Sequence, residues 1–211
     1  MPVSEHPMQA LAAFLPDGSF EQVVHYIHHY KVHLTISKQR KSVLGDYRHS
    51  GAWGSNHRIS VNGNLNKYEF LITLLHELAH LLTYELHKNR VEPHGKEWKA
   101  HYSRLLVDFV QQKLFPADIE KGLQKSIINP SATANGETDL LLVLRKYNVA
   151  KKPGFVPVID IPEGAVFQTE NGKIFRKGAK RRKRFECVEI KTGLHYTFSP
   201  ISEVKLIETS V

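Results

Sequence analysis

The sequence of 211 residues predicts an α+β protein built in two parts. In the first part, apolar residues recur at helical spacing on both sides of three short, strand-like segments. From Phe155 onwards, apolar and polar residues alternate in short runs, and Asn171–Gly172 and Thr192–Gly193 mark turns between these runs. Residues 129–138, which are rich in Pro, Ser, Ala, Asn and Gly, are typical of a linker. We therefore expect a mixed domain followed by a small all-β C-terminal domain.

Local patterns predict the elements of the first part. In chain order they are a helix over residues 9–30 that breaks near residues 16–18, strands over 32–37, 43–48 and 57–62, a helix over 68–87 and a second helix over 96–114. A shorter helical stretch follows Phe115–Pro116. Residues 139–147 form either a helix or a buried strand, because their periodicity fits both. The expected domains are 1–125 and 155–211, and the linker over 126–154 contains this short helix or strand.

Composition limits the class of protein. Apolar residues make up 41% of the chain, which is enough for a packed core, and no apolar run approaches the eighteen residues of a membrane span. The N-terminus lacks the basic start and apolar stretch of a signal peptide. Cys187 is the single cysteine, so the chain has neither an internal disulfide framework nor a zinc ribbon built from cysteine pairs. These observations lead us to expect a cytoplasmic protein with no membrane partner.

The most informative motif is His76-Glu77-Leu78-Ala79-His80, inside the helix predicted over 68–87. Residues four apart on a helix lie on one face, so both imidazoles can reach the same metal ion. Glu77 would then lie beside that ion, where its carboxylate can take a proton from an attacking water molecule. The pattern predicts a catalytic metal site.

A catalytic zinc site usually has three protein ligands, so one is missing from this motif. His87 lies on the same helix face, but at ~1.5 Å rise per residue it is roughly 10 Å beyond His80. His94 is the best candidate, because it follows the break at Pro93 and opens the next helix, where the chain has turned back. His101 is again roughly 10 Å further along, so we expect it to support the site or the fold. The alternative is a carboxylate ligand, from Glu92 or Glu97.

The two histidine motifs resemble a known family. Leu75-His76-Glu77-Leu78-Ala79-His80-Leu81-Leu82 and Pro93-His94-Gly95-Lys96-Glu97-Trp98 are similar to the motifs of the SprT-like zinc metallopeptidases. That family includes the Spartan-type proteases, which cut proteins crosslinked to DNA. The resemblance covers roughly residues 5–115 and implies a zincin-like catalytic domain with an N-terminal helix, a three-stranded sheet, the HExxH helix and a second helix.

By the same resemblance, His76, His80 and His94 would be Zn²⁺ ligands and Glu77 would be the catalytic acid/base. Many family members also carry a C-terminal zinc ribbon of two cysteine pairs, which this chain lacks. The expected activity is metal-dependent hydrolysis of peptide bonds in a protein substrate. In such proteases the substrate lies antiparallel to an edge strand beside the zinc helix, and we expect residues 57–62 to form that strand. The residue that stabilises the oxyanion is not assigned, and Tyr84 and Tyr102 are expected to be packing residues.

Two other functions fit the same residues. The first is a non-proteolytic nucleic-acid-binding or transcription-associated factor with a structural zinc site. Glu77 argues against it, because a structural site needs no base. The second is a metal hydrolase that acts on a bond other than a peptide bond.

Positive charge is concentrated in the C-terminal part of the chain. The net charge is +8, of which residues 1–150 contribute +3 (17 Lys and Arg against 14 Asp and Glu) and residues 151–211 contribute +5 (12 against 7). Six cations fall within eight residues, and they are Lys177, Lys180, Arg181, Arg182, Lys183 and Arg184. We expect this run to bind DNA or another nucleic acid through phosphates, and the flanking Phe175 and Phe185 to lie in the core.

Overall fold

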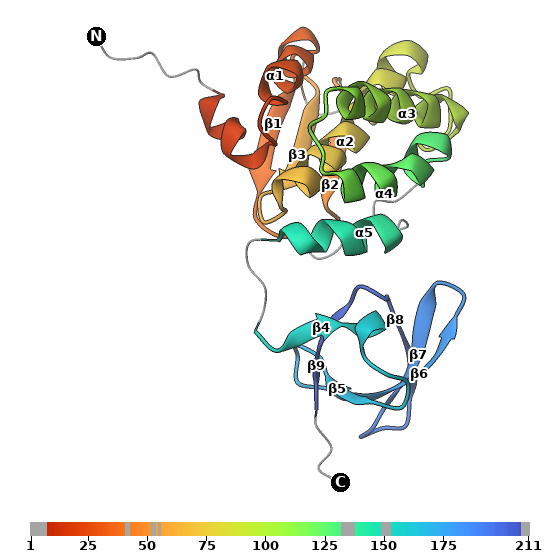
Figure 1. Cartoon of the computed structure of the whole chain (residues 1–211). Coiled ribbons are helices and arrows are strands. Elements are labelled where there is room, and N and C mark those ends of the chain that lie inside the picture. The colour runs from red at the N-terminus through yellow and green to blue at the C-terminus, as the bar shows by residue number, and fades with distance from the viewer. Residues whose placement is uncertain are drawn as a thin grey trace. The chain divides into compact units, whose positions relative to one another are not determined.

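The computed structural model describes residues 8–40, 43–51, 54, 56–131, 138–148 and 153–207. The chain divides into two compact units, Met1–Asn148 and Val149–Val211 (Figure 1). Unit 1 combines helices with one sheet, and unit 2 has a second sheet with short 3₁₀ segments, so the prediction of an α+β protein with an all-β C-terminal region is confirmed. Among the described residues, no helix has the length and apolarity needed to cross a membrane.

Unit 1 begins with two short helices and a three-stranded sheet. These elements are the 3₁₀ helix η1 (Gln9–Phe14), helix α1 (Phe20–His29) and strands β1 (His33–Ser37), β2 (Gly45–Arg48) and β3 (Arg58–Asn62). In the sheet the strand order is β1-β3-β2, with β3 parallel to β1 and antiparallel to β2. The central strand is therefore β3, and β2 forms one edge.

The helices of unit 1 pack in a series that starts from this sheet. They are α2 (Lys67–His87), α3 (Lys96–Gln111), α4 (Ala117–Ile128) and α5 (Thr138–Leu144), which the 3₁₀ helix η3 (Arg145–Tyr147) extends. Helix α2 contacts β2 and β3 on one side and α3 on the other, α3 contacts α4, and α4 contacts α5 (Figure 1). Because α2 is covered from both sides, it is apolar almost all round, and twelve of its residues are buried.

Residues 138–144 form a helix, which settles the choice that the sequence leaves open between helix and strand. Leu140, Leu141 and Leu144 are buried against unit 1. The Asn66 side chain caps α2 by accepting a hydrogen bond from the backbone N–H of Glu69 (3.0 Å). Its Nδ2 also donates to the backbone oxygen of Leu144 (2.9 Å). The end of α5 is thereby tied to the start of α2, so α5 packs as part of unit 1.

Unit 2 is a six-stranded antiparallel sheet. Its elements are β4 (Phe155–Pro157), the 3₁₀ helix η4 (Val158–Asp160), β5 (Val166–Gln168), β6 (Ile174–Arg181), β7 (Arg184–Glu189), β8 (His195–Phe198) and β9 (Glu203–Leu206). The strand order is β4-β9-β5-β6-β7-β8. Phe167, Phe175, Phe185 and Cys187 are buried in its core, as expected for the two phenylalanines that flank the basic run.

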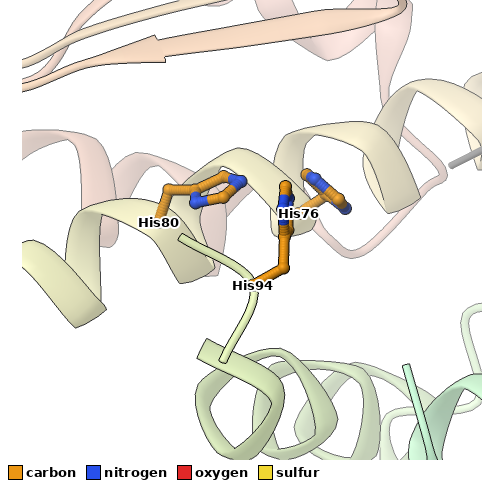
Figure 2. Close-up of side chains that lie close together, drawn as sticks. All are labelled: His76, His80 and His94. Atoms are coloured by element: carbon orange, nitrogen blue, oxygen red, sulfur yellow. The ribbon is translucent and has the colours of Figure 1, made fainter. Parts of the chain in front are cut away.

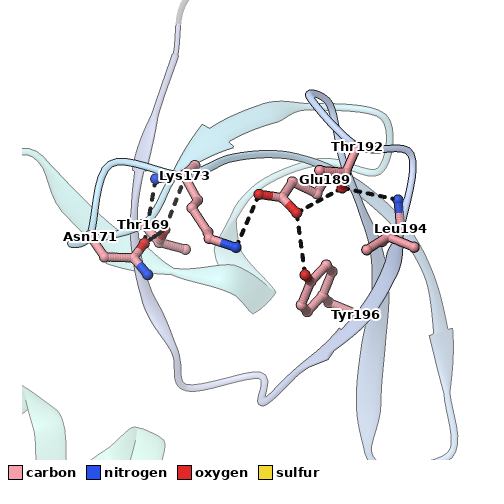
Figure 3. A network of polar contacts seen from close by, with 7 residues as sticks. All are labelled: Thr169, Asn171, Lys173, Glu189, Thr192, Leu194 and Tyr196. Atoms are coloured by element: carbon pink, nitrogen blue, oxygen red, sulfur yellow. Dashed lines mark hydrogen bonds and ion pairs between the residues drawn. The ribbon is translucent and has the colours of Figure 1, made fainter.

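A buried carboxylate stabilises the turn between β7 and β8. Glu189 accepts hydrogen bonds from the hydroxyl groups of Thr192 (2.8 Å) and Tyr196 (3.2 Å) and pairs with the ammonium group of Lys173 (3.2 Å) (Figure 3). The side chain of Glu189 is 6% exposed, so these three donors replace the water that it loses. The network connects β6, β7 and β8 at one end of the sheet.

Candidate metal centre

Helix α2 places His76 and His80 on the same face, one helical turn apart. The helix continues without a break to His87, and Thr83 bonds through its hydroxyl to the backbone oxygen of Ala79 (2.7 Å) inside it. A third histidine from the same helix would therefore be too far along the axis. Consistent with this, Leu86 is exposed and His87 is half-buried, and His87 belongs to no cluster of potential ligands within the described residues.

His94 comes from the segment that returns from α2 to α3. Helix α2 ends at Lys88, whose φ of 53° turns the chain, and α3 begins after Gly95. Gly95 fits tightly here, because a Cβ atom would lie 3.2 Å from Cβ of Glu92 and 3.3 Å from its backbone oxygen. In Figure 2 the imidazole of His94 points from this segment towards those of His76 and His80 on α2.

The three imidazoles form a cluster that fits a metal ion. One nitrogen atom from each ring can be chosen so that all three lie within 4.8 Å of one another. The Nε2 atom of His94 is buried and has no hydrogen-bond partner in the described part of the chain. A buried nitrogen with a free lone pair is costly unless it meets a proton or a cation. Three imidazole nitrogens this close together suit a transition metal that prefers imidazole ligands.

Burial keeps these imidazoles neutral. It lowers the pKa of His76 to about 3, with further lowering by His80 and His94, and lowers the pKa of His80 to about 4. The pKa of His94 is lowered by burial as well. A neutral imidazole has a lone pair to offer a metal ion, whereas a protonated one has none. At neutral pH the three imidazoles therefore have lone pairs available for a cation.

The indole ring of Trp98 packs against all three imidazoles of the cluster. Its side chain is fully buried on α3, and its ring centroid lies 4.7 Å from those of His76 and His94 and 5.3 Å from that of His80. Tyr102, one turn further along α3, packs against both Trp98 and His76 and is buried, in line with the packing role expected for it. No role for Trp98 was predicted from the sequence, although its position four residues after His94, at the start of a helix, was a usable signal.

Glu77 is buried beside the cluster and faces strand β2. A Cβ atom on Gly45 would lie only 2.5 Å from Oε1 of Glu77, so the glycine is what allows the strand to approach. The pKa of Glu77 is raised to about 8, mainly by burial and also by the charge of Asp46, whereas Arg40 opposes the shift. The three histidines and Glu77 line one cavity of about 490 Å³, which is bounded by β2, α2 and the segment before α3.

The other candidate ligands lie outside the cluster. Within the described residues, the group that could hold a metal contains the three histidines and no carboxylate, so neither Glu92 nor Glu97 belongs to it. His101 is on α3, near His87, and burial lowers its pKa. The structure thus brings together His76, His80 and His94 and separates His87 and His101 from them.

The prediction that residues 57–62 form the edge strand for the substrate is wrong. Residues 57–62 contain β3, which pairs with β1 on one side and β2 on the other and therefore has no free edge. The edge strand that borders the cavity is β2, and Gly45, Asp46 and Tyr47 line it. Sequence proximity to α2 favoured β3, whereas the crossover between β1 and β2 places β2 at the edge.

The basic run divides into one buried and five exposed cations. Lys180, Arg181, Arg182, Lys183 and Arg184 are exposed on the hairpin of β6 and β7. Lys177 is different, because it is 5% exposed, donates to the backbone oxygen of Ile161 and lies 4.1 Å from the ring centroid of Phe185. Side chains alternate along a strand, so Lys177 points inward like Phe175, two residues before it. The prediction that Lys177 contacts nucleic acid is therefore wrong. Burial also lowers its pKa.

Comparison with known proteins finds a similarity for part of the larger unit. Residues 17–117 match the SprT-like family. Protein SprT of Klebsiella pneumoniae (strain 342) is 39% identical over 80 residues, which cover 31% of this chain and 48% of that relative. The chain thus spans about half the length of the curated relative it matches, and no solved structure matches it. The matched residues include α2, the segment with His94 and all of α3. Residues 17–117 of this chain are therefore similar to the SprT-like family.

Proposed function

We propose that the SprT-like domain is a zincin-like, zinc-dependent peptidase. The observation that carries the proposal is the meeting of three neutral imidazoles and the buried carboxyl group of Glu77 at a cavity that an edge strand borders. The raised pKa of Glu77 belongs to the metal-free chain, and a cation bound beside it would favour the ionised form that acts as the base. A purely structural metal site is normally closed by four protein ligands and has no use for a base. Here the described residues supply three ligands beside an open cavity, which favours catalysis over a structural role.

In this proposal each residue has a defined task. His76, His80 and His94 hold the metal. A bound Zn²⁺ would supply Lewis acidity, which makes a water molecule a better nucleophile and polarises the scissile carbonyl. A carboxylate oxygen of Glu77 takes the proton from the attacking water and later passes it to the leaving amine. Trp98 and Tyr102 exclude water from behind the ligands, because both are buried.

Strand β2 is our proposed binding site for the substrate backbone. It pairs with β3 along one edge, and its other edge borders the cavity that contains the histidines. An extended peptide can add to such an edge through main-chain hydrogen bonds, and this mode reads little sequence. Selectivity would then depend on which proteins are brought to the site.

Substitution of Glu77 tests the proposed chemistry. Glu77→Gln keeps the size of the side chain but cannot act as a base, so zinc content should stay while cleavage of an unfolded protein substrate falls by at least ~10²-fold. Glu21→Gln, on the exposed face of α1, is the matched control and should cleave like the wild type. A wild-type chain that holds one zinc ion yet cleaves nothing would favour a structural zinc site. Activity retained by Glu77→Gln would remove this carboxylate from the mechanism.

We also propose that the hairpin of β6 and β7 delivers the peptidase to proteins on nucleic acid. Five exposed cations lie within Lys180–Arg184, and one of them, Arg181, pairs with Glu186 (2.8 Å). If the hairpin neutralises about four phosphates of duplex DNA, the log–log dependence of affinity on salt should have a slope of roughly −4. Phosphate contacts carry no sequence information, so little base preference is expected.

A charge-matched pair of variants tests this delivery. The hairpin variant replaces four cations by alanine, at Arg181, Arg182, Lys183 and Arg184. The control variant removes the same charge from exposed positions of unit 1, at Lys67, Lys121, Lys125 and Lys146. The salt slope should flatten in the hairpin variant and stay in the control. Equal changes in both would mean that net charge alone attracts the DNA, and no change in either would exclude the hairpin.

A further inference from the structure

A chain of side-chain contacts connects the edge strand to the metal helix. The hydroxyl oxygen of Tyr47, on β2, lies 2.9 Å from Nδ1 of His57. The Nε2 atom of the same ring lies 3.3 Å from Oε1 of Glu85, on α2. His57 is buried, so its two nitrogen atoms depend on these partners and on Ser50, whose hydroxyl lies 3.5 Å from Nε2. The chain therefore joins three elements: β2, the residue before β3, and α2.

One neutral form of His57 satisfies both ends of this chain. The Tyr47 hydroxyl donates to Nδ1, and Nε2–H donates to the carboxylate of Glu85. The same oxygen, Oε1 of Glu85, also pairs with the ammonium group of Lys88 (3.1 Å). The hydroxyl group of Tyr47 is thus bonded to the imidazole of His57, which Glu85 orients. This hydrogen bond restricts rotation of the Tyr47 ring.

The ring of Tyr47 packs against a candidate metal ligand. Its plane lies within 5° of the imidazole plane of His80, with ring centroids 6.3 Å apart. The indole of Trp98 packs against the same imidazole, at 5.3 Å. The imidazoles of His94 and His76 also contact it, at 4.6 and 5.1 Å between ring centroids, but both are candidate ligands themselves. Tyr47 and Trp98 are thus the aromatic rings from outside the candidate ligand set that pack against His80 among the described residues.

We propose that Tyr47 is a positioning residue for the metal centre: held by His57 and Glu85, its ring fixes the imidazole of His80 and couples the edge strand to that ligand. The inference rests on the proposed metal site but not on proteolysis. Groups outside the ligand shell typically change metal affinity by 10–100-fold when they are removed, because they orient the ligands. A role in fold stability alone would lower the melting temperature and leave the metal site unaltered.

The test measures binding of Co²⁺ to the full chain, by competition with a chelator and by the visible absorption of the bound ion. Tyr47→Phe keeps the ring and removes the hydroxyl, and Glu85→Ala removes the other end of the chain. Each should weaken Co²⁺ binding about tenfold or more and alter the spectrum. The double variant should be little worse than either single one, because both break the same chain. Glu85→Gln keeps an acceptor oxygen and should recover most of the affinity.

Tyr30→Phe is the matched control, since it removes the same atom from unit 1 at the end of α1, outside the cavity. Wild-type affinity and spectrum in Tyr47→Phe, with or without a lower melting temperature of the metal-free chain, would overturn the inference. Additive losses in the double variant would also overturn it, because the residues would then act separately. Wild-type protein that binds Co²⁺ but cleaves no peptide would refute the proposed peptidase and leave this result standing. A wild type that binds no Co²⁺ would refute both.

Discussion

Gly45→Ala should inactivate the proposed peptidase without removing its metal. A Cβ atom at this position would lie 2.5 Å from Oε1 and 2.9 Å from Cγ of Glu77, and 2.9 Å from Cγ2 of Thr73. Ordinary van der Waals contact begins near 3.4 Å, so the carboxylate would have to move by about 0.9 Å, or β2 would have to retreat. A misplacement of about 1 Å can cost roughly 10²-fold in rate, because the reacting atoms lose their alignment.

The assay compares peptide cleavage with zinc content in the same preparations. We expect turnover to fall by about 10²-fold in Gly45→Ala while zinc stays bound, because the three atoms nearest to the added methyl group belong to Glu77 and Thr73 and not to a histidine. Gly63→Ala is the matched control: its Cβ would lie 2.7 Å from Cγ2 of Ile36, so it crowds the same sheet away from Glu77. Wild-type turnover in Gly45→Ala would refute the packing of β2 against the base. Loss of zinc together with turnover would show that the strand acts on the ligands instead.

Three further predictions follow from the two units. His94→Ala should lose most of its zinc in metal analysis, whereas His87→Ala and His101→Ala should retain it; equal loss in His87→Ala would contradict the cluster. Metal removal by a chelator should lower the melting temperature, since an ion at 100 times its Kd stabilises a fold by about 2.7 kcal/mol; an unchanged temperature would mean that the site binds weakly. Glu189→Ala should destabilise unit 2 by about 1–3 kcal/mol in denaturant unfolding, because three donors lose a charged acceptor. The Thr192 hydroxyl is the main cause of a lowered pKa of Glu189, so this stability is present above the ordinary carboxyl pKa and is lost as pH falls through the lowered value; a wild-type response to acid in Glu189→Ala would contradict it.

Local patterns predicted the elements that local forces determine. The apolar spacing that predicted a helix over 68–87 belongs to a helix that the structure places at Lys67–His87. The break at Pro93 likewise indicated that His94 returns towards His80, and the two ring centroids lie 4.6 Å apart. Both outcomes depend on a few residues in one stretch of chain, where helical geometry and chain breaks are sufficient.

Local sequence patterns could not predict which strands pair with one another. The pairing of β1 with β3 leaves β2 at the edge, and no residue within β3 predicts that order, because it depends on how the three strands pair and how β2 and β3 fit against α2. The alternation of buried and exposed residues that starts at Phe175 could have predicted that Lys177 points inward. Because lysine is charged, it was expected on the surface instead. A buried lysine is unusual, and here the backbone oxygen of Ile161 and the ring of Phe185 compensate its burial.

Strand β2 contacts Glu77 and His80 and also provides the free edge beside the cavity. The geometry of the strand explains how four residues can make both contacts. Alternate residues on a strand are about 6.6–6.8 Å apart, close to the 5.4 Å of one helical turn. Gly45 therefore meets Glu77 while Tyr47 meets His80, roughly one turn further along α2. A shift of β2 by one residue would present Asp46 to α2 instead, placing a second carboxylate against Glu77 and removing the ring from His80. The register of β2, set by the pairing of Gly45 with Val61, thus fixes the contacts to Glu77 and His80 and the free edge together.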